Sequence, residues 1–167
     1  KEVKKVVTKI KAVESGIQSL SDDGLRDKTA EFKEKIKSAT AKFTTQIDEI
    51  KEQIKNSTNV DEKEALFTKI EGLKKESYDV EEKVLGEILP EAFALVKETS
   101  RRLAQNGEIR VTATERDREL AATKDFVVLE GDTAVWKYSW DAAGTPVVWD
   151  MVHYDTQFIG GVVLHSG

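Results

Sequence analysis

The segment from Phe43 to Val84, FTTQIDEIKEQIKNSTNVDEKEALFTKIEGLKKESYDVEEKV, carries two runs of apolar residues spaced alternately by three and four positions. This is the a/d spacing of a coiled coil, in which successive apolar residues return to one helix face. A polar stretch, NSTNVD, separates the runs, and Asn59 with Glu62 can cap the helix that follows it. The pattern predicts two long helices that pack as an antiparallel hairpin. The seam positions are Phe43, Ile47, Ile50 and Ile54 in the first run and Leu66, Ile70, Leu73, Ser77, Val80 and Val84 in the second.

Two more helices are predicted before the hairpin. The first has one apolar face and ends near Ser15 and Gly16. The second starts at Ser21, whose hydroxyl can cap the helix, while Leu20 can pack on Leu25 across the first turn. The apolar face of the first helix consists of Val3, Val6, Val7, Ile10 and Val13.

After the hairpin, Pro90 suits the first position of a new helix, because the N–H that proline lacks has no partner there. Asn106 and Gly107 predict the end of this helix. A last helix is predicted from Gln157 onward.

Residues 109–151 change to the alternating pattern of strands. They predict one small antiparallel sheet, with a turn at residues 130–132 and three tryptophans in its core. Its shared face would hold Ala134, Trp136, Tyr138 and Trp140. The charged stretch TERDRELAATKD, residues 114–125, is predicted to be a loop between strands that serves as an exposed connection or a partner contact and not as a catalytic element.

The composition excludes several classes of protein. Charged residues make up 34% of the 167 residues, and 31 acidic and 26 basic side chains are interspersed, so no basic surface for nucleic acid is expected. With no cysteine, a disulfide framework and a thiolate metal site are both excluded. The lack of cysteine also favours a cytoplasmic protein. No apolar run is long enough to span a bilayer and no signal peptide is visible, so any membrane contact is expected to be peripheral or through a partner.

Motifs for chemistry are missing from the sequence. It contains no GxxxxGK[ST], GxGxxG or GxSxG pattern. The two histidines, His153 and His165, are not spaced as ligands on one helical turn and are expected to be capping or surface residues. We therefore expect no catalytic residue and no metal site in this chain.

Three blocks of the sequence closely resemble the start of the SecA family of preprotein translocase ATPases. They are KKVVTKIKAVESGIQSLSDDGLRDKTAEFKEKI (residues 4–36), GEILPEAFALVKETSRR (residues 86–102) and MVHYDTQFIGGVVLHSG (residues 151–167). In the family, these blocks are nearly contiguous and lead into the phosphate-binding loop of the first nucleotide-binding domain. The resemblance implies that this chain is the N-terminal piece of that domain, cut before the loop, with two insertions.

The resemblance also implies a division of the chain. The SecA-like part would comprise residues 1–38, 85–103 and 151–167. Residues 39–84 would be an inserted helical hairpin, and residues 104–150 an inserted β-sheet module. The expected fold class is α+β and mainly helical, with a coiled-coil hairpin and a small antiparallel sheet, as an incomplete piece of a P-loop helicase-like α/β domain.

For the nucleotide, the resemblance implies that Gln157 is the glutamine that reads adenine, with Met151 and Tyr154 lining the same pocket. Tyr154 could stack on the base. The family usually has arginine where this chain has Val152, which removes a polar contact. The residues alone also allow Gln157 to be a helix-start residue that caps its neighbours.

ATP and Mg²⁺ are the cofactors that the resemblance implies for the parent protein, while the piece itself would be inactive and bind neither tightly. The implied partners are the SecYEG channel and unfolded preproteins at the cytoplasmic face of the inner membrane, with acidic phospholipid and a homodimer as further candidates. The alternative is a non-enzymatic interaction module in which the hairpin and the sheet bind a partner.

Overall fold

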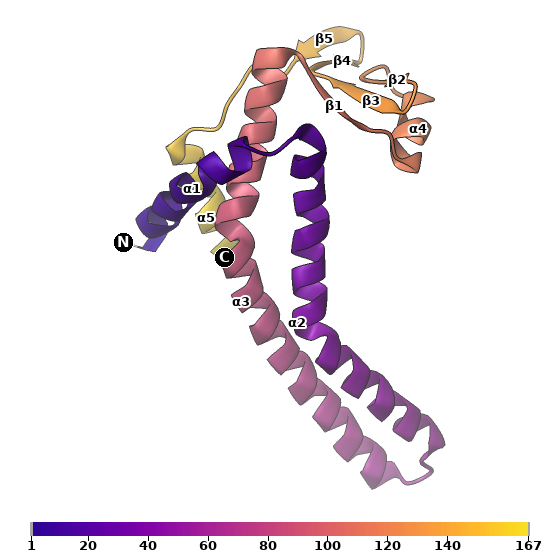
Figure 1. The fold of residues 1–167 in the computed structure, drawn as a ribbon. Helices are drawn as coiled ribbons and strands as arrows, with labels where there is room; N and C mark the ends of the chain where they lie inside the picture. The colour runs from indigo at the N-terminus through magenta and orange to yellow at the C-terminus, as the bar shows by residue number, and fades with distance from the viewer. Residues whose placement is uncertain (1, 167) are drawn as a thin grey trace. The chain divides into compact units, whose positions relative to one another are not determined.

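A computed structural model describes the backbone of residues 2–166 and the side chains of residues 5–165, so the prediction for the Val3 side chain lies outside the described residues (Figure 1). The described chain is mainly helical with little β-structure, as predicted. It divides into two compact units, Lys1–Thr29 with Pro90–Gly167, and Ala30–Leu89. The helices are α1 (Glu2–Gln18), α2 (Asp22–Asn56), α3 (Val60–Asn106), α4 (Glu115–Ala121) and α5 (Asp155–Ser166); the strands are β1 (Glu108–Thr112), β2 (Val127–Glu130), β3 (Thr133–Lys137), β4 (Ser139–Ala142) and β5 (Thr145–Val148).

The unit Ala30–Leu89 is the predicted hairpin, formed by the second part of α2 and the first part of α3 (Figure 1). Phe43, Ile50 and Ile70 are buried along its seam. At the turn, Asn59 Oδ1 accepts hydrogen bonds from the backbone N–H of Asp61 (2.9 Å) and of Glu62 (3.3 Å). The predicted hairpin and the cap by Asn59 are confirmed, but the Glu62 carboxylate accepts from Ser57 Oγ (2.5 Å) and the Asn59 N–H donates to that same Oγ (3.2 Å), so the predicted pairing of Asn59 with Glu62 is only half present.

The prediction that a new helix starts at Pro90 is wrong, because Pro90 lies inside α3. A proline removes the hydrogen bond to the carbonyl four residues earlier, here that of Gly86. Gly86 is exposed and has no side chain, so water can reach that carbonyl. The buried apolar residues Ile88 and Ala94 on either side keep the helix continuous.

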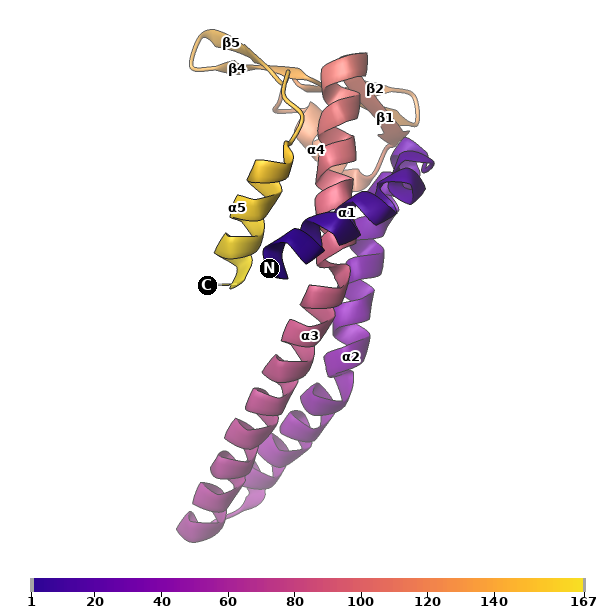
Figure 2. The same cartoon turned by 90° about the vertical axis from the view of Figure 1, so that its left-hand side faces the viewer.

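In the other unit, α1, the start of α2, the end of α3 and α5 share one apolar core (Figure 2). The predicted cap at Ser21 is confirmed, since its Oγ accepts from the backbone N–H of Gly24 at 3.0 Å. Leu20 and Leu25 meet in the core, as the staple requires. The buried members are Ile10, Ile17, Leu25, Ala94 and Phe158.

Arg102 of α3 joins three helices through its guanidinium. Its Nε donates to Glu98 Oε1 (2.7 Å) and its Nη1 to Asp22 Oδ1 (2.5 Å). Its Nη2 donates to the carbonyls of Gln18 (3.2 Å) and Leu20 (2.6 Å). Gln18 is the last residue of α1 and Leu20 lies just after it, so neither carbonyl has a partner within that helix. The side chain of Arg102 is only 11% exposed, so each of these acceptors compensates for lost water.

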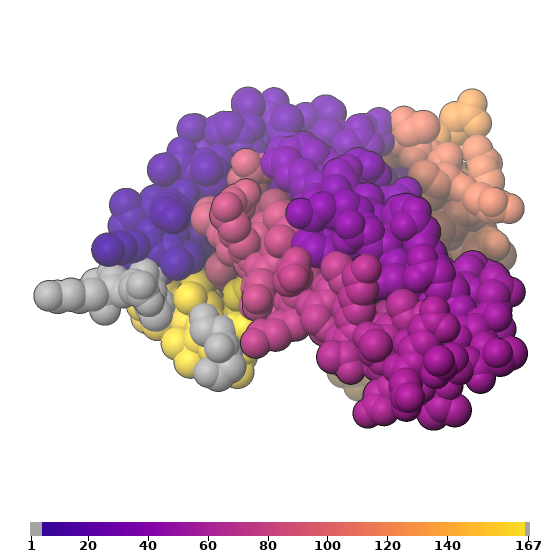
Figure 3. Space-filling view, turned by 90° about the horizontal axis from the view of Figure 1, so that it is seen from below, coloured from indigo at the N-terminus to yellow at the C-terminus, as the bar shows by residue number. Residues whose placement is uncertain are grey.

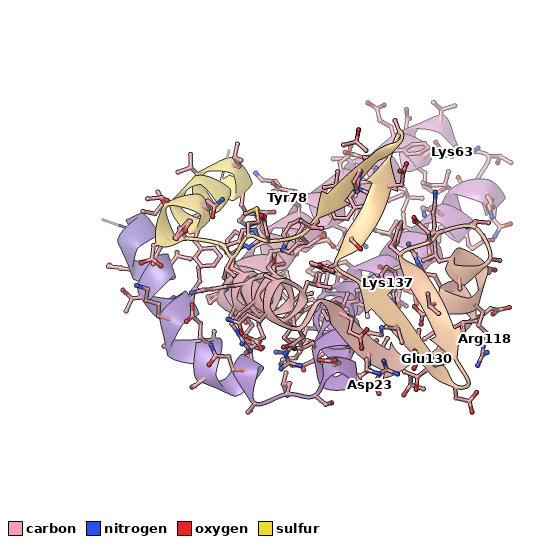
Figure 4. All side chains as sticks on the ribbon, turned by 90° about the horizontal axis from the view of Figure 1, so that it is seen from above. Asp23, Lys63, Tyr78, Arg118, Glu130 and Lys137 are labelled. Atoms are coloured by element: carbon pink, nitrogen blue, oxygen red, sulfur yellow. The ribbon has the colours of Figure 1, made fainter. Side chains whose placement is uncertain are left out.

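The sheet of strand order β1-β3-β2 is fastened to α2 along its β1 edge. On β1, the backbone groups of Arg110 and Thr112 point away from β3, because the hydrogen-bonded pairs of this antiparallel ladder fall on the alternate residues. The N–H of Arg110 donates to Asp22 Oδ2 (3.0 Å) and that of Thr112 to Asp23 Oδ1 (2.8 Å). Figure 4 labels Asp23 at the start of α2 beside this strand. Two carboxylates of the first turn of α2 thus cover an otherwise open sheet edge.

The charged stretch predicted to be a loop contains the helix α4, so that prediction is wrong. Thr114 and Asp117 form a complete capping box, a local signal that the charge pattern obscured. Asp117 is 2% exposed, and its carboxylate accepts two hydrogen bonds from Arg26 (2.7 and 3.0 Å) and one from Trp136 Nε1 (3.1 Å). The helix therefore attaches the sheet to α2 a second time.

The prediction of a single sheet is also wrong, because β4 and β5 form a separate two-stranded sheet. Tyr138 lies between β3 and β4, where its N–H bonds to the carbonyl of Gly107 (2.9 Å) and its carbonyl accepts from Trp149 (2.7 Å). This break interrupts the alternation, so Trp136 and Trp140 belong to different sheets. The predicted turn is confirmed at Gly131, whose φ of 64° suits glycine.

The Asp117→Asn variant tests the attachment of α4. We expect the free energy of unfolding to fall by about 2 to 3 kcal/mol, because Arg26 loses a bidentate carboxylate that is almost fully buried. Urea unfolding followed by tryptophan fluorescence measures the change. Glu115→Gln, in the exposed first turn of the same helix, is the matched control, and an equal effect of both variants would contradict the assignment.

The same ion pair predicts loss of stability in acid. Burial raises the pKa of Asp117, but the hydrogen bonds from Arg26 and Thr114 outweigh it, and the pKa lies below its ordinary value. A lowered pKa stabilises the fold above the unfolded value of about 3.9, and the gain is lost as pH falls through the folded value. Between pH 5 and 3, stability should therefore fall less steeply in Asp117→Asn than in the wild type; parallel curves would contradict this.

Candidate functional site

The residues predicted to bind adenine lie together at the start of α5. They line an open hollow of about 1070 Å³, formed by Lys97 of α3 and the consecutive residues 150–157. Met151, Tyr154 and Gln157 are all exposed there, Met151 at 38% and Tyr154 at 76%. Val152 lines the same hollow and is half-buried. We call this surface the Gln157 hollow.

Gln157 is held by the helix start that it helps to form. Tyr154 is the N-cap of α5, and Gln157 is the third helical residue. The backbone N–H of Tyr154 donates to Gln157 Oε1 at 2.8 Å, which is half of a capping box. The capping role that the residues alone allowed is therefore present. This bond also determines which end of the carboxamide is the oxygen.

The helix α5 is anchored by its buried face. Phe158 and Val162 are 2% and 5% exposed, and Phe158 packs with Phe93 at 5.6 Å between ring centroids. Ile159, Val163 and Leu164 of the same helix are exposed. Figure 3 shows α5, in yellow, at the molecular surface. The side chain that follows Gln157 thus fixes the helix against the core while Gln157 faces outward.

His153 differs from its prediction. It is half-buried, and its ring stacks on Phe158 at 6.1 Å with 14° between the planes. Its Nδ1 is buried and has no hydrogen-bond partner among the described residues. His165 is exposed on α5, as predicted. Within the residues whose side chains are described, no group of three or more metal-binding side chains is present.

Sequence reasoning missed Lys97 and Asp155. Lys97 Nζ lies 2.6 Å from Glu14 Oε1 and 5.6 Å from the centroid of the Phe158 ring. Asp155 Oδ2 lies 2.5 Å from Lys11 Nζ. Lys97 belongs to one of the blocks that carry the family resemblance, but no local sequence pattern connects it with Gln157, 60 positions later. Asp155 carries the ordinary signal of an acidic residue in a first helical turn.

The comparisons with known proteins cover the whole chain. A family model described as the SecA DEAD-like domain matches residues 1–167. The chain belongs to the SecA family. The protein translocase subunit SecA of Flavobacterium psychrophilum is 49% identical over 167 residues, that of Christiangramia forsetii 49%, and that of Porphyromonas gingivalis 50%.

Each of these alignments includes all of this chain and 15% of the relative's length. The hairpin and the sheet region are therefore shared with these SecA relatives. No solved structure matches the chain significantly. No helix in the described part of the chain is both long and apolar enough to cross a membrane.

Substitutions at the adjacent glycines Gly160 and Gly161 test how closely α5 packs against α3. A Cβ added at Gly161 would lie 2.9 Å from Phe93 Cζ, whereas one at Gly160 would meet nothing within 4 Å. We expect Gly161→Ala to destabilise the fold by about 1 to 3 kcal/mol through overpacking. Gly160→Ala should be neutral or stabilising by up to about 1 kcal/mol, because alanine favours helix. Urea unfolding of both variants measures the contrast, and equal values would contradict the tight contact.

Proposed function

We propose that this chain forms the adenine-contacting wall of the nucleotide site of a SecA-type translocase. The observation that carries the proposal is the exposed Gln157, held at the start of α5 by the N–H of Tyr154 and flanked by Tyr154 and Met151. The match to a SecA DEAD-like domain model supports a nucleotide-binding domain.

The chemistry of Gln157 suits adenine. A carbonyl oxygen has two lone pairs, so Oε1 can accept from the adenine N6 amine while it retains the bond from Tyr154. Nε2 can then donate to adenine N7, the pairing that glutamine makes with adenine in DNA. Guanine presents an acceptor, O6, in place of the N6 amine, so the same carboxamide would disfavour it. In this proposal, the capping bond orients the carboxamide for adenine before the nucleotide binds.

Tyr154 and Met151 would cover the base, Tyr154 by stacking and Met151 by apolar contact. Val152 supplies only apolar surface in this scheme. The phosphate loop and the groups that hold Mg²⁺ would come from other parts of the parent protein. Residues 1–38, 85–103 and 151–167 would belong to a P-loop helicase-like domain, with residues 39–84 and 104–150 as its insertions.

The relatives are named protein translocase subunits, which supports a translocation activity for the parent protein. We propose that the parent couples ATP binding and hydrolysis to the passage of unfolded preproteins through the SecYEG channel. It would act in the cytoplasm and at the cytoplasmic face of the inner membrane.

A second candidate function is an interaction module. Phe67 and Tyr78 are 55% and 61% exposed on α3 within the hairpin, and Figure 4 labels Tyr78. Eleven residues apart, they lie on one helix face. A hairpin that docks a partner would need such side chains but would not need Gln157.

The test uses the parent protein and the variant Gln157→Glu. Glutamate keeps an oxygen for the Tyr154 N–H, and so keeps the helix start, but it lacks the donor for adenine N7. We expect ATP affinity to fall about tenfold or more, from the loss of one partner of a bidentate contact. Isothermal titration with ATP measures the dissociation constant.

The matched control is Gln53→Ala, an exposed glutamine of the hairpin. It should leave the ATP affinity unchanged. Equal affinities of wild type and Gln157→Glu would contradict the adenine assignment and favour the interaction module.

A further inference from the structure

One turn of α1 holds two charged residues of the Gln157 hollow. Lys11 pairs with Asp155 at 2.5 Å, and Glu14 pairs with Lys97 at 2.6 Å. Both Asp155 and Lys97 line the hollow, although α1 itself contributes no lining residue. Lys11 and Glu14 are three residues apart and therefore lie on the same side of the helix.

The two pairs flank Gln157 along the chain. Asp155 is the first residue of α5, two positions before Gln157, and its carboxylate lies at the positive end of the helix dipole. Lys97 lies over the ring of Phe158, the residue after Gln157. Groups next to Gln157, in the chain and in space, are thus paired with α1.

The pairs are separate from the contacts that seat α1. Ile10 and Ile17 are buried in the core that also contains Phe158, and Val13 packs against it. The Lys11 and Asp155 side chains are 54% and 45% exposed, and ion pairs this exposed contribute little to stability. The hydrogen bond with Asp155, and then its charge, raise the pKa of Lys11, so Lys11 is charged throughout the neutral range.

We propose that the Lys11–Glu14 turn of α1 positions the start of α5 for adenine recognition, with Lys11 and Glu14 as positioning residues. This inference rests on the adenine site proposed above. It assigns α1 a part in nucleotide specificity, because a displaced carboxamide loses the geometry that separates adenine from guanine. A purely structural role of the same residues would change both nucleotide affinities alike.

The experiment measures the dissociation constants of ATP and GTP for the parent protein in three variants. Lys11→Met removes the ion pair and keeps the length of the side chain. Lys11→Arg keeps the charge and the pairing. Lys9→Met changes the net charge by the same amount at an exposed position of α1.

We expect Lys11→Met to lower the preference for ATP over GTP about two- to fivefold, the range of an exposed ion pair. Lys11→Arg and Lys9→Met should keep the wild-type preference. In an Asp155→Asn background, Lys11→Met should have no further effect.

The outcomes separate the two proposals. A wild-type protein that binds ATP and GTP equally well overturns the adenine site itself. A wild type that prefers ATP, with the same preference in Lys11→Met, overturns only the role of α1. Equal weakening of both nucleotides in Lys11→Met, or the same loss of preference in Lys9→Met, also overturns it.

Discussion

The arrangement of α1, the start of α2 and the C-terminal part of α3 depends on the hydrogen bonds of the Arg102 guanidinium. The guanidinium meets the end of α1, the start of α2 and the preceding turn of α3 through four acceptors. A charge this deeply buried is tolerated only when its hydrogen bonds are complete, so the arrangement of the three helices is specified by one side chain. Burial raises the pKa of Glu98, but the hydrogen bonds from Arg101 and Arg102 outweigh it and lower that pKa overall, which keeps the carboxylate charged.

Polar contacts extend from Arg102 and its acceptors toward β1 and toward the Gln157 hollow. Asp22 shares its carboxylate between Arg102 and the backbone of β1, so the sheet is attached where the helices meet. In the other direction, α1 pairs Lys11 with Asp155 of α5 and Glu14 with Lys97 of α3. Apolar packing forms the core, while charged groups link the β1 edge to α2 and two residues of the Gln157 hollow to α1.

Much of the helical structure could be predicted from local patterns, because the hairpin seam and the caps at Ser21 and Asn59 are signals within a few residues. The helix start predicted at Pro90 was wrong because the local sequence does not show the packing of Ile88 and Ala94, which stabilises a helix that continues through the proline. The helix α4 has a local capping signal in Thr114 and Asp117, but the surrounding charges resemble a solvated loop. The burial of Asp117 could not be predicted, because its partner Arg26 is 91 residues away. The break at Tyr138 depends on bonds to Gly107 and Trp149, which alternation cannot show.

The residues of the candidate site were predicted by another route than the helices. Family resemblance, and not local pattern, indicated Gln157, Tyr154 and Met151, and the structure brings all three to one hollow. Whether they bind adenine is still a prediction. Lys97 could not be predicted, because its place in the hollow depends on how α3 packs against α5, and its partner Glu14 lies 83 residues earlier.

Photolabelling tests directly whether adenine binds in the Gln157 hollow, because it reports where the base lies and does not depend on a change in affinity. An ATP analogue with an azide at C8 of adenine would be bound to the parent protein, irradiated, and the labelled peptides mapped by mass spectrometry. If Gln157 contacts adenine, labelling is expected within residues 150–157, at Tyr154 or Met151, and excess ATP should prevent it. Labelling that ATP prevents but that lies wholly outside these residues would contradict this contact.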